Sequence, residues 1–335
     1  MKRAAPKVAL LGAGRMGAIH GLNAARNPRL DLAYLIDPRE DSAARLADEL
    51  GCRRPTLAEA LADPELVGVL IASPTDTHLE FVLTCLRANK AVFCEKPLDL
   101  ELSRLRGAEP ELISPTAPLY VAFNRRFDSH FLALKAKLAS GEVGALESLN
   151  LISHDPAPPP PSFIPTSGGM FRDFTIHDFD VAAWLIEEEP VEVFAWASCL
   201  VDPAIGAAGD VDTARVVLRY PSGRMCTISN TRRSAYGYDQ RAEAYGSRGM
   251  AMAGNPRIST VDTWNEAGAL AAPLFASFQE RYAQSYRAEL DHFADVLAGA
   301  TKPITAYVAS RDALILAEAV GQSVRTGRIV RVNDI

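Results

Sequence analysis

Three polar side chains in one short segment have types and spacings suited to proton transfer. Asp173, His177 and Asp180 lie in the stretch FRDFTIHDFDVAAWL. Their spacings of four and three residues would place them on one face of a single helix. The same face continues along residues 181–185 as an apolar stripe. A polar cluster directly above a buried stripe is typical of a pocket wall, and we expect one here.

Three kinds of site would account for this cluster. A histidine ionises near neutral pH, so His177 beside a carboxylate could act as a general acid or base. A metal site could also use Asp and His at this spacing, but no further histidine or cysteine stands near them as a partner. The carboxylates could instead cap the helix and form salt bridges on it. We favour proton transfer.

Lys96 is a second candidate for chemistry, far from the first cluster in sequence. It follows an apolar run at residues 91–94 and precedes Pro97. A proline favours an extended backbone in the residue before it and ends the strand. At such a strand end the ammonium would point into a crevice and could stabilise negative charge developing on an oxygen. A solvated lysine is the ordinary alternative for a short motif such as EKP.

The segment GAGRMG carries the G-x-G-x-x-G pattern between a short apolar run at residues 7–11 and a helical pattern. The first glycine permits a tight turn, the second lets a pyrophosphate approach the backbone, and the third allows close packing of helix on strand. The helix N-terminus would face the phosphates. The residues of this predicted cofactor loop are Gly12, Gly14, Arg15, Met16 and Gly17.

Asp37 stands about twenty residues after the glycine segment, at the end of the next apolar run. Its carboxylate could accept hydrogen bonds from both adenosine ribose hydroxyls and would repel a 2′-phosphate, which favours NAD over NADP. Arg39 nearby weakens that preference. A glycine turn with a surface acid is the alternative. Later strand ends would add Ser73, Thr75, His78, Glu95 and Lys96 to the cofactor site, with a surface or capping role for His78 equally open.

Alternating apolar runs and helical patterns organise the first part of the chain. The runs lie at residues 7–11, 32–36, 66–72, 91–94 and 120–123. Short buried strands alternating with helices indicate βαβ units and a doubly wound parallel sheet, so we predict an NAD-binding Rossmann domain at residues 1–123.

The character of the sequence changes after residue 123. Longer strand-like runs lie at residues 146–153, 191–201, 212–220, 224–230 and 240–245, and helical patterns close the chain at 281–297 and 310–325. We predict a C-terminal α/β domain at residues 124–335, built on an open, mostly antiparallel sheet. The proline-rich segment 156–161 should be a stiff loop, because proline lacks the amide donor and fixes φ.

Composition limits the class of protein. The net charge is −6, which argues against a nucleic-acid partner because such proteins usually carry a basic face. No apolar stretch is long enough to cross a membrane. The five cysteines are scattered without a CxxC pair, which is typical of reduced thiols. We therefore expect a cytoplasmic enzyme without a metal ion.

Nine stretches together resemble the Gfo/Idh/MocA oxidoreductase family, in particular its inositol 2-dehydrogenase branch. They are GAGRMG, LIDPRE, SPTDTH, EKPLDL, FNRRFD, HDPAPPPPSFIPTSGG, DFTIHDFD, AYGYDQRAEAYGSRG and ERYAQSYRAEL, and they span nearly the whole chain in order. The first and fourth are common to the larger family. FNRRFD, the proline loop and DFTIHDFD are specific to the inositol branch.

The resemblance implies a Rossmann domain followed by an α/β domain whose open sheet builds a homotetramer. It implies NAD-dependent oxidation of a secondary alcohol of a cyclic polyol, with myo-inositol to 2-keto-myo-inositol (scyllo-inosose) as the leading reaction. Lys96, Asp173 and His177 match the catalytic positions. Positions that line the polyol site are matched by Asn124, Arg125, Asp155, Asp180, Tyr236 and Tyr238.

Two departures from the family pattern leave the polyol open. Arg172 replaces an apolar residue, and Ala183 stands where many inositol enzymes carry arginine. Scyllo-inositol, another inositol or a pyranose sugar is therefore an alternative substrate. An NAD-dependent glycosidase and a non-catalytic NAD or sugar sensor are more distant alternatives.

The expected mechanism divides the proton chemistry among three groups. His177 would be the general base, and the Lys96 ammonium would stabilise the alkoxide. Asp173 would orient His177 or pass the proton on. This requires Lys96 and His177 to converge on the nicotinamide.

Overall fold

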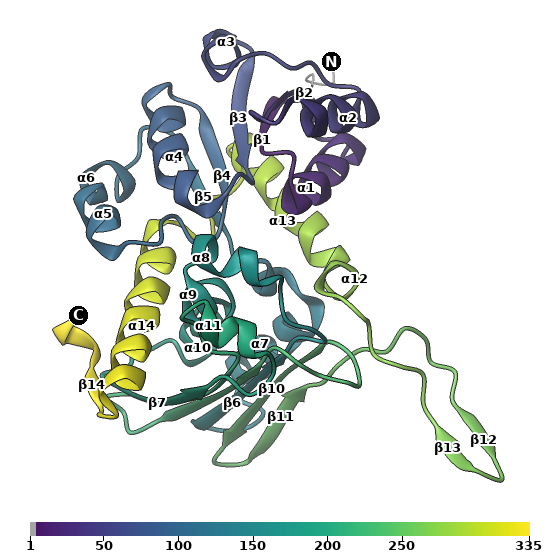
Figure 1. Cartoon of the computed structure of the whole chain (residues 1–335), viewed down its shortest axis with the longest axis vertical. Helices are drawn as coiled ribbons and strands as arrows, with labels where there is room; N and C mark the ends of the chain where they lie inside the picture. Colours follow the sequence, from purple (N-terminus) through teal and green to yellow (C-terminus); the bar gives the residue numbers. More distant parts are fainter. Residues whose placement is uncertain (1–4) are drawn as a thin grey trace. The chain divides into compact units, whose positions relative to one another are not determined.

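The computed structural model describes residues 5–335, which fold into two compact units (Figure 1). The first unit runs to Asn124 and includes Ser285–Leu314, and the second comprises Arg125–Gln284 and Ile315–Ile335. The chain thus leaves the first unit one residue after the expected boundary. Assigning everything beyond residue 123 to one domain is nevertheless incorrect, because residues 285–314 return to the first unit.

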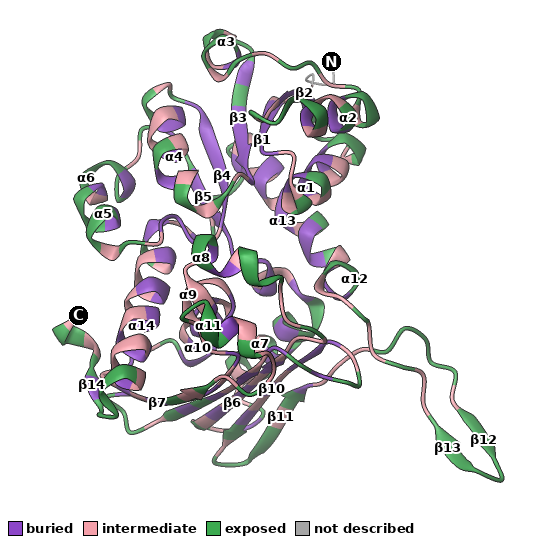
Figure 2. Cartoon of the chain, in the orientation of Figure 1, coloured by how far each residue is buried: buried purple, intermediate pink, exposed green. Residues whose placement is uncertain are grey.

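The first unit is built on a five-stranded, all-parallel sheet with the strand order β2-β1-β3-β4-β5. The strands are β1 (Lys7–Leu11), β2 (Asp31–Ile36), β3 (Leu66–Ile71), β4 (Ala91–Glu95) and β5 (Leu119–Ala122). Most of their residues are buried, as Figure 2 shows, because helices cover a parallel sheet on both faces. The predicted doubly wound parallel sheet is confirmed.

Helices connect these strands. They are α1 (Arg15–Arg26), α2 (Glu40–Leu50), α3 (Leu57–Ala62), α4 (His78–Arg87), α5 (Leu102–Gly107) and α6 (Glu109–Leu112), followed much later in the chain by α13 (Ala283–Leu297). The short α3 was not expected from periodicity. A capping box starts it, because Thr56 and Glu59 each accept a hydrogen bond from the other's backbone amide.

Helix α13 belongs to the first unit because it completes the core beside β4 and β5. The hydroxyl of Tyr120 donates to Glu289, 2.9 Å away, and the Phe93 ring packs edge-on against Phe293. The hydroxyl of Thr305, beyond the helix, donates to the carbonyl of Val121. These contacts explain why a segment so late in the sequence folds with the N-terminal strands.

The second unit is built on a seven-stranded sheet with the order β11-β10-β6-β9-β8-β7-β14. The strands are β6 (Leu146–His154), β7 (Glu192–Ser198), β8 (Thr213–Arg219), β9 (Met225–Thr231), β10 (Asp239–Gly246), β11 (Gly249–Ala253) and β14 (Val330–Arg331). All neighbouring strands are antiparallel except β6 and β9, which run parallel. The predicted open, mostly antiparallel sheet is confirmed.

The helices of the second unit are α7 (Ser129–Ala139), α8 (Ile164–Ser167), α9 (Gly169–Asp173), α10 (Ile176–Ile186), α11 (Pro203–Ala207), α12 (Phe278–Arg281) and α14 (Tyr307–Thr326), the last shared with the first unit. Helix α7 packs against β11 and α10 against β6, on one face of the sheet. The other face leaves large side chains exposed, including Trp196 at 70% and Met225 at 50%. A separate exposed hairpin pairs β12 (Thr263–Asn265) with β13 (Gly268–Leu270).

Two further predictions, one on the proline-rich segment and one on the cysteines, agree with the structure. Residues 156–160 form no helix or strand, and a single 3₁₀ turn, Pro161–Phe163, follows. Each of the five cysteines is a free thiol. Over the described part of the chain, none of the helices is both long and apolar enough to cross a bilayer.

Candidate active site

The glycine turn lies between β1 and α1, beside the point where the strand order reverses between β1 and β3. Gly12 has a φ of +105°, and a Cβ there would lie 2.5 Å from the carbonyl oxygen of Ala72. A Cβ on Gly17 would lie 2.0 Å from the carbonyl oxygen of Gly12. Neither position tolerates a side chain, as expected for the tight turn and for close packing of helix on strand.

Gly14 has a different environment. A Cβ at this helix-capping position would meet nothing closer than a guanidinium nitrogen of Arg39, at 3.7 Å. The space above Gly14 is therefore open, and the first amides of α1 face it. An anion at a helix N-terminus is stabilised by those amides and by the helix dipole. The turn thus fits the pyrophosphate of a dinucleotide.

Asp37 follows β2 and lies against this turn. Its carboxylate accepts hydrogen bonds from the amide of Ala13 at 2.6 Å and from the amide of Arg39 at 2.8 Å. The Arg39 guanidinium adds two contacts of 3.2 Å. Burial alone would raise the pKa of Asp37, but these hydrogen bonds outweigh it and the pKa is lowered. A fixed negative charge therefore stands where the adenosine ribose of NAD would bind.

His78 is neither the surface residue nor the simple cap that the sequence left open. Its side chain is buried, with one ring nitrogen 2.8 Å from the carbonyl oxygen of Pro97 and the other 2.9 Å from that of Ser73. Burial lowers its pKa. His78 thus ties together the loops that follow β3 and β4, while direct contact with a cofactor stays a prediction.

The loops after β3 and β4 also carry the other predicted cofactor residues. Thr75 opens a 3₁₀ turn, Thr75–Thr77, and the Ser73 hydroxyl lies 2.7 Å from that of Thr77. Glu95 ends β4, and its buried carboxylate lies 2.6 Å from a ring nitrogen of His20. Burial would raise the pKa of Glu95, but the hydrogen bond and charge of His20, together with the charges of Lys96 and His78, outweigh it and the pKa is lowered. Lys96 follows directly, joined to Pro97 by a cis peptide bond.

In the second unit, the single helix expected to carry Asp173, His177 and Asp180 does not exist. Helix α9 ends at Asp173 and α10 begins at Ile176. The amide of Thr175 donates to the carbonyl of Met170, five residues back, and its hydroxyl donates to the side chain of Asn230. These bonds replace a regular helical turn, so the three residues do not share one helix face.

Asp180 is paired with an arginine of the second unit. Both of its carboxylate oxygens accept hydrogen bonds from the Arg126 guanidinium, at 2.7–3.1 Å, and the residue is buried. The Arg126 guanidinium also lies over the ring of Trp184. This geometry fixes α10 to the segment after β5, and a polyol contact for Asp180 remains a prediction.

Asp178 was not singled out from the sequence, yet it organises the interior beneath the site. Its carboxylate accepts hydrogen bonds from Arg125, from the Ser153 hydroxyl at 2.6 Å, and from the Asn230 amide at 2.8 Å. All four residues are buried. Arg125, expected to line the polyol site, is therefore engaged by Asp178, and Asn124 beside it is buried as well.

The parallel strands β6 and β9 end side by side and place two more charged residues together. His154 pairs with Thr231 in register, and the next residues are Asp155 and Arg232. The amide of Asp155 donates to the carbonyl of Thr231, 2.9 Å away. Arg232 is buried, and its guanidinium lies 3.7 Å from the carboxylate of Asp173. The structure thus brings Asp155 and Asp173 into one cluster around Arg232.

Asp155 has an ionisation suited to proton transfer. Burial raises its pKa to about 7, nearby Asp173 and Asp178 add to this, and Arg232 and Arg125 oppose it. A carboxyl group that titrates near the working pH can both accept and release a proton. The sequence pointed to Asp155 only through its place in the proline loop, and Arg232 gave no signal beyond a pair of adjacent arginines.

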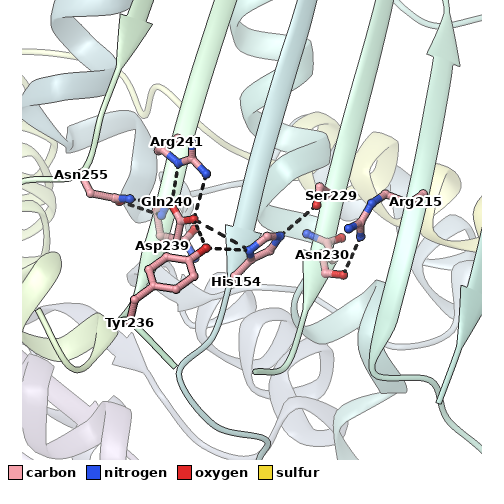
Figure 3. Close-up of polar contacts among 9 residues, drawn as sticks. All are labelled: His154, Arg215, Ser229, Asn230, Tyr236, Asp239, Gln240, Arg241 and Asn255. Carbon is pink, nitrogen blue, oxygen red and sulfur yellow. Dashed lines mark hydrogen bonds and ion pairs between the residues drawn. The ribbon is translucent and has the colours of Figure 1, made fainter. Parts of the chain in front are cut away.

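The two tyrosines of the YGY motif differ in environment. Tyr236 is 59% exposed, and its hydroxyl donates to Asp239 at 2.7 Å (Figure 3). Figure 3 also shows Arg241, Asn255 and His154 directed at the same carboxylate. Tyr238 is buried and packs edge-on against Tyr282. Their expected joint role in polyol binding stays a prediction.

The fold and the site together define the class of protein. A parallel doubly wound sheet, a glycine turn at the strand-order reversal and an anionic Asp37 make a dinucleotide-binding unit. A second unit carries the aspartates and His177. Within the described residues, no group of three or more His, Cys, Asp or Glu side chains is arranged to hold a metal ion. This combination is typical of an NAD-dependent oxidoreductase.

Comparison with known proteins gives the family. Residues 6–108 match the oxidoreductase family with an NAD-binding Rossmann fold, and residues 131–252 match the Gfo/Idh/MocA C-terminal domain. The chain therefore belongs to the Gfo/Idh/MocA oxidoreductase family, as the sequence motifs predicted, and NAD is its cofactor.

Three relatives are similar over nearly their whole length. A myo-inositol 2-dehydrogenase of Thermotoga maritima is 40% identical, covering 98% of this chain and 99% of the relative. An inositol 2-dehydrogenase of Rhizobium meliloti is 39% identical, covering 96% and 98%. A crystal structure of scyllo-inositol dehydrogenase from Lactobacillus casei with bound NAD(H) and scyllo-inositol is 25% identical, with a TM-score of 0.89 and coverage of 98% and 99%.

Proposed function

We propose that the protein oxidises one secondary alcohol of a cyclic polyol with NAD, most favourably myo-inositol to 2-keto-myo-inositol. The observation that carries the proposal is the near-complete alignment with two inositol 2-dehydrogenases at 39–40% identity. The cluster of Asp155, Asp173 and Arg232 supports it, because hydroxyl-rich substrates are bound by charged and polar groups.

We assign the proton chemistry to residues of this chain. NAD⁺, held by the residues of the first unit, would supply the acceptor for the hydride that leaves the carbon atom. His177 removes the hydroxyl proton as general base, and the Lys96 ammonium donates a hydrogen bond to the oxygen as its charge grows. Asp173 orients His177 or receives the proton from it. The products are the ketone, NADH and one proton.

The cofactor is held by the first unit. The glycine turn of Gly12, Gly14, Arg15, Met16 and Gly17 would receive the pyrophosphate, and Asp37 the adenosine ribose. The loops carrying Ser73, Thr75, His78, Glu95 and Lys96 would complete the cofactor site. Asn124, Arg125, Asp155, Asp180, Tyr236 and Tyr238 are retained as proposed polyol-site residues, with Asp155 the best supported by geometry.

A scyllo-inositol specificity is the second candidate. A scyllo-inositol 2-dehydrogenase of Bacillus subtilis is 32% identical over 98% of this chain. A panel of inositol isomers and aldoses, scored by NADH absorbance, decides between the two. The highest kcat/KM on myo-inositol supports the main proposal, while NADH formation from none of them refutes both.

We also propose a cytoplasmic homotetramer. Free thiols at all five cysteines suit a reducing compartment. The exposed Trp196 and Met225 on the open face of the seven-stranded sheet suit burial against another copy. Light scattering of the purified protein tests the tetramer, and a monomer at micromolar concentration would contradict it.

A further inference from the structure

Arg232 is the largest fully buried side chain of the described residues, at 1% exposure. A buried guanidinium stays charged and is costly unless carboxylates face it. Arg125 and Arg281, also buried, each donate hydrogen bonds to an aspartate. In Arg232, by contrast, Nε and Nη2 make no hydrogen bond with any described residue. Structural hydrogen bonds therefore do not explain why the charge of Arg232 is buried.

The groups around Arg232 indicate the role of its charge. Its Nη2 lies 3.7 Å from Asp173 Oδ2, too far for a hydrogen bond but close enough for a strong electrostatic interaction. Asp155 stands beside it at the end of the neighbouring parallel strand. The guanidinium also lies over the Phe174 ring, with its carbon 5.6 Å from the ring centre. The guanidinium itself is buried, whereas the Asp173 side chain is 25% exposed, so only the arginine end of this interaction is fully shielded from solvent.

We propose that Arg232 is a positioning residue that holds the carboxyl groups of Asp155 and Asp173 together in the site and favours their ionised forms, an inference that rests on the proposed function. Two carboxylates brought together repel each other, and a cation close to them offsets that repulsion. Arg232 would thereby set the pH range over which the site can accept a proton. It need not touch the substrate to do so.

Burial and four charged side chains determine the pKa of Asp155. Asp173 and Asp178 favour its neutral form, as burial does, whereas Arg232 and then Arg125 favour the carboxylate. Arg125 is already paired with Asp178. Removal of Arg232 should therefore make Asp155 harder to ionise, and Arg125 cannot fully replace it.

The test compares Arg232→Met with Arg232→Lys, using Arg233→Met as matched control because Arg233 is adjacent and exposed. Carbon-13 NMR of aspartate carboxyls, assigned with Asp155→Asn, follows ionisation without any substrate. In Arg232→Met we expect the Asp155 midpoint to rise by about one unit or more. Arg232→Lys should keep it nearer the wild-type value, and Arg233→Met should leave it unchanged.

Turnover gives the second readout. The acid limb of kcat/KM for the polyol should move to higher pH in Arg232→Met, with the KM for NAD unchanged. A wild-type midpoint and pH profile in Arg232→Met would overturn the proposal. So would failure of Arg232→Met and Arg232→Gln to fold where Arg232→Lys folds, since the role would then be structural. A shifted midpoint in an enzyme that oxidises no inositol would refute the proposed function and leave the role of Arg232 intact.

Discussion

The guanidinium of Arg39 lies against the carboxylate of Asp37, with Nε and Nη2 each 3.2 Å from an oxygen. We expect Asp37 both to exclude a 2′-phosphate and to occupy the arginine that could bind one. In Asp37→Ala we expect the NADP/NAD ratio of kcat/KM to rise about tenfold or more, roughly 1.4 kcal/mol. Initial rates with both cofactors measure it. The double variant Asp37→Ala/Arg39→Ala should lose the gain, and an unchanged ratio in the single variant would refute this role for Asp37.

His177→Ala and Lys96→Ala should each lower kcat by roughly 10²–10⁴-fold, because a positioned base and an alkoxide-stabilising cation each contribute on that scale. Quenching of protein fluorescence by NADH should show that cofactor binding survives. The exposed His130→Ala and Lys302→Ala serve as matched controls. Full turnover in either site variant would remove that residue from the mechanism.

Asp178→Ala should destabilise the protein by roughly 3–5 kcal/mol, because it leaves the buried Arg125 without its counter-ion. It also removes the acceptor for Ser153 and Asn230. Urea unfolding followed by circular dichroism measures the loss. The exposed Asp48→Ala should change stability by no more than about 0.5 kcal/mol. Equal stability of the two variants would contradict the assigned network.

Asp155→Asn should change how stability depends on pH. The folded-state pKa of Asp155, about 7, lies above the ordinary 3.8, so folding takes up a proton between these values. The stability this contributes is fully present below about pH 4 and is lost as pH rises through about 7. The melting temperature of Asp155→Asn relative to wild type should therefore increase from pH 5 to pH 8. A difference that does not vary with pH would contradict the raised pKa.

Much of the fold could be predicted because it depends on local patterns. Continuous apolar runs marked the five parallel strands, and the glycine segment marked the turn before α1. The parallel pairing of β6 with β9 could not be predicted, because strand order depends on contacts between distant residues. The place of residues 285–314 was missed for the same reason, since it depends on the packing of Phe293 and Glu289 against residues of β4 and β5.

The candidate site was predicted less completely. Helical spacing placed Asp173, His177 and Asp180 on one face, but the bond from Thr175 to Asn230 breaks the helix between them. The partners of the aspartates come from other elements: Arg126 for Asp180, Asn230 for Asp178, and Arg232 for Asp173. Such pairings cannot be predicted from the spacing of residues within a single segment.

The return of residues 285–314 to the first unit has a consequence for how the protein can be divided. The chain passes between the units after residues 124, 284 and 314. A fragment ending near residue 123 would contain every strand of the parallel sheet, but not Phe293 and Glu289, which cover Phe93 and Tyr120. It would therefore expose an apolar surface and tend to aggregate. Exchange of the cofactor-binding half with a relative requires both the N-terminal segment and the later helix to be transferred together.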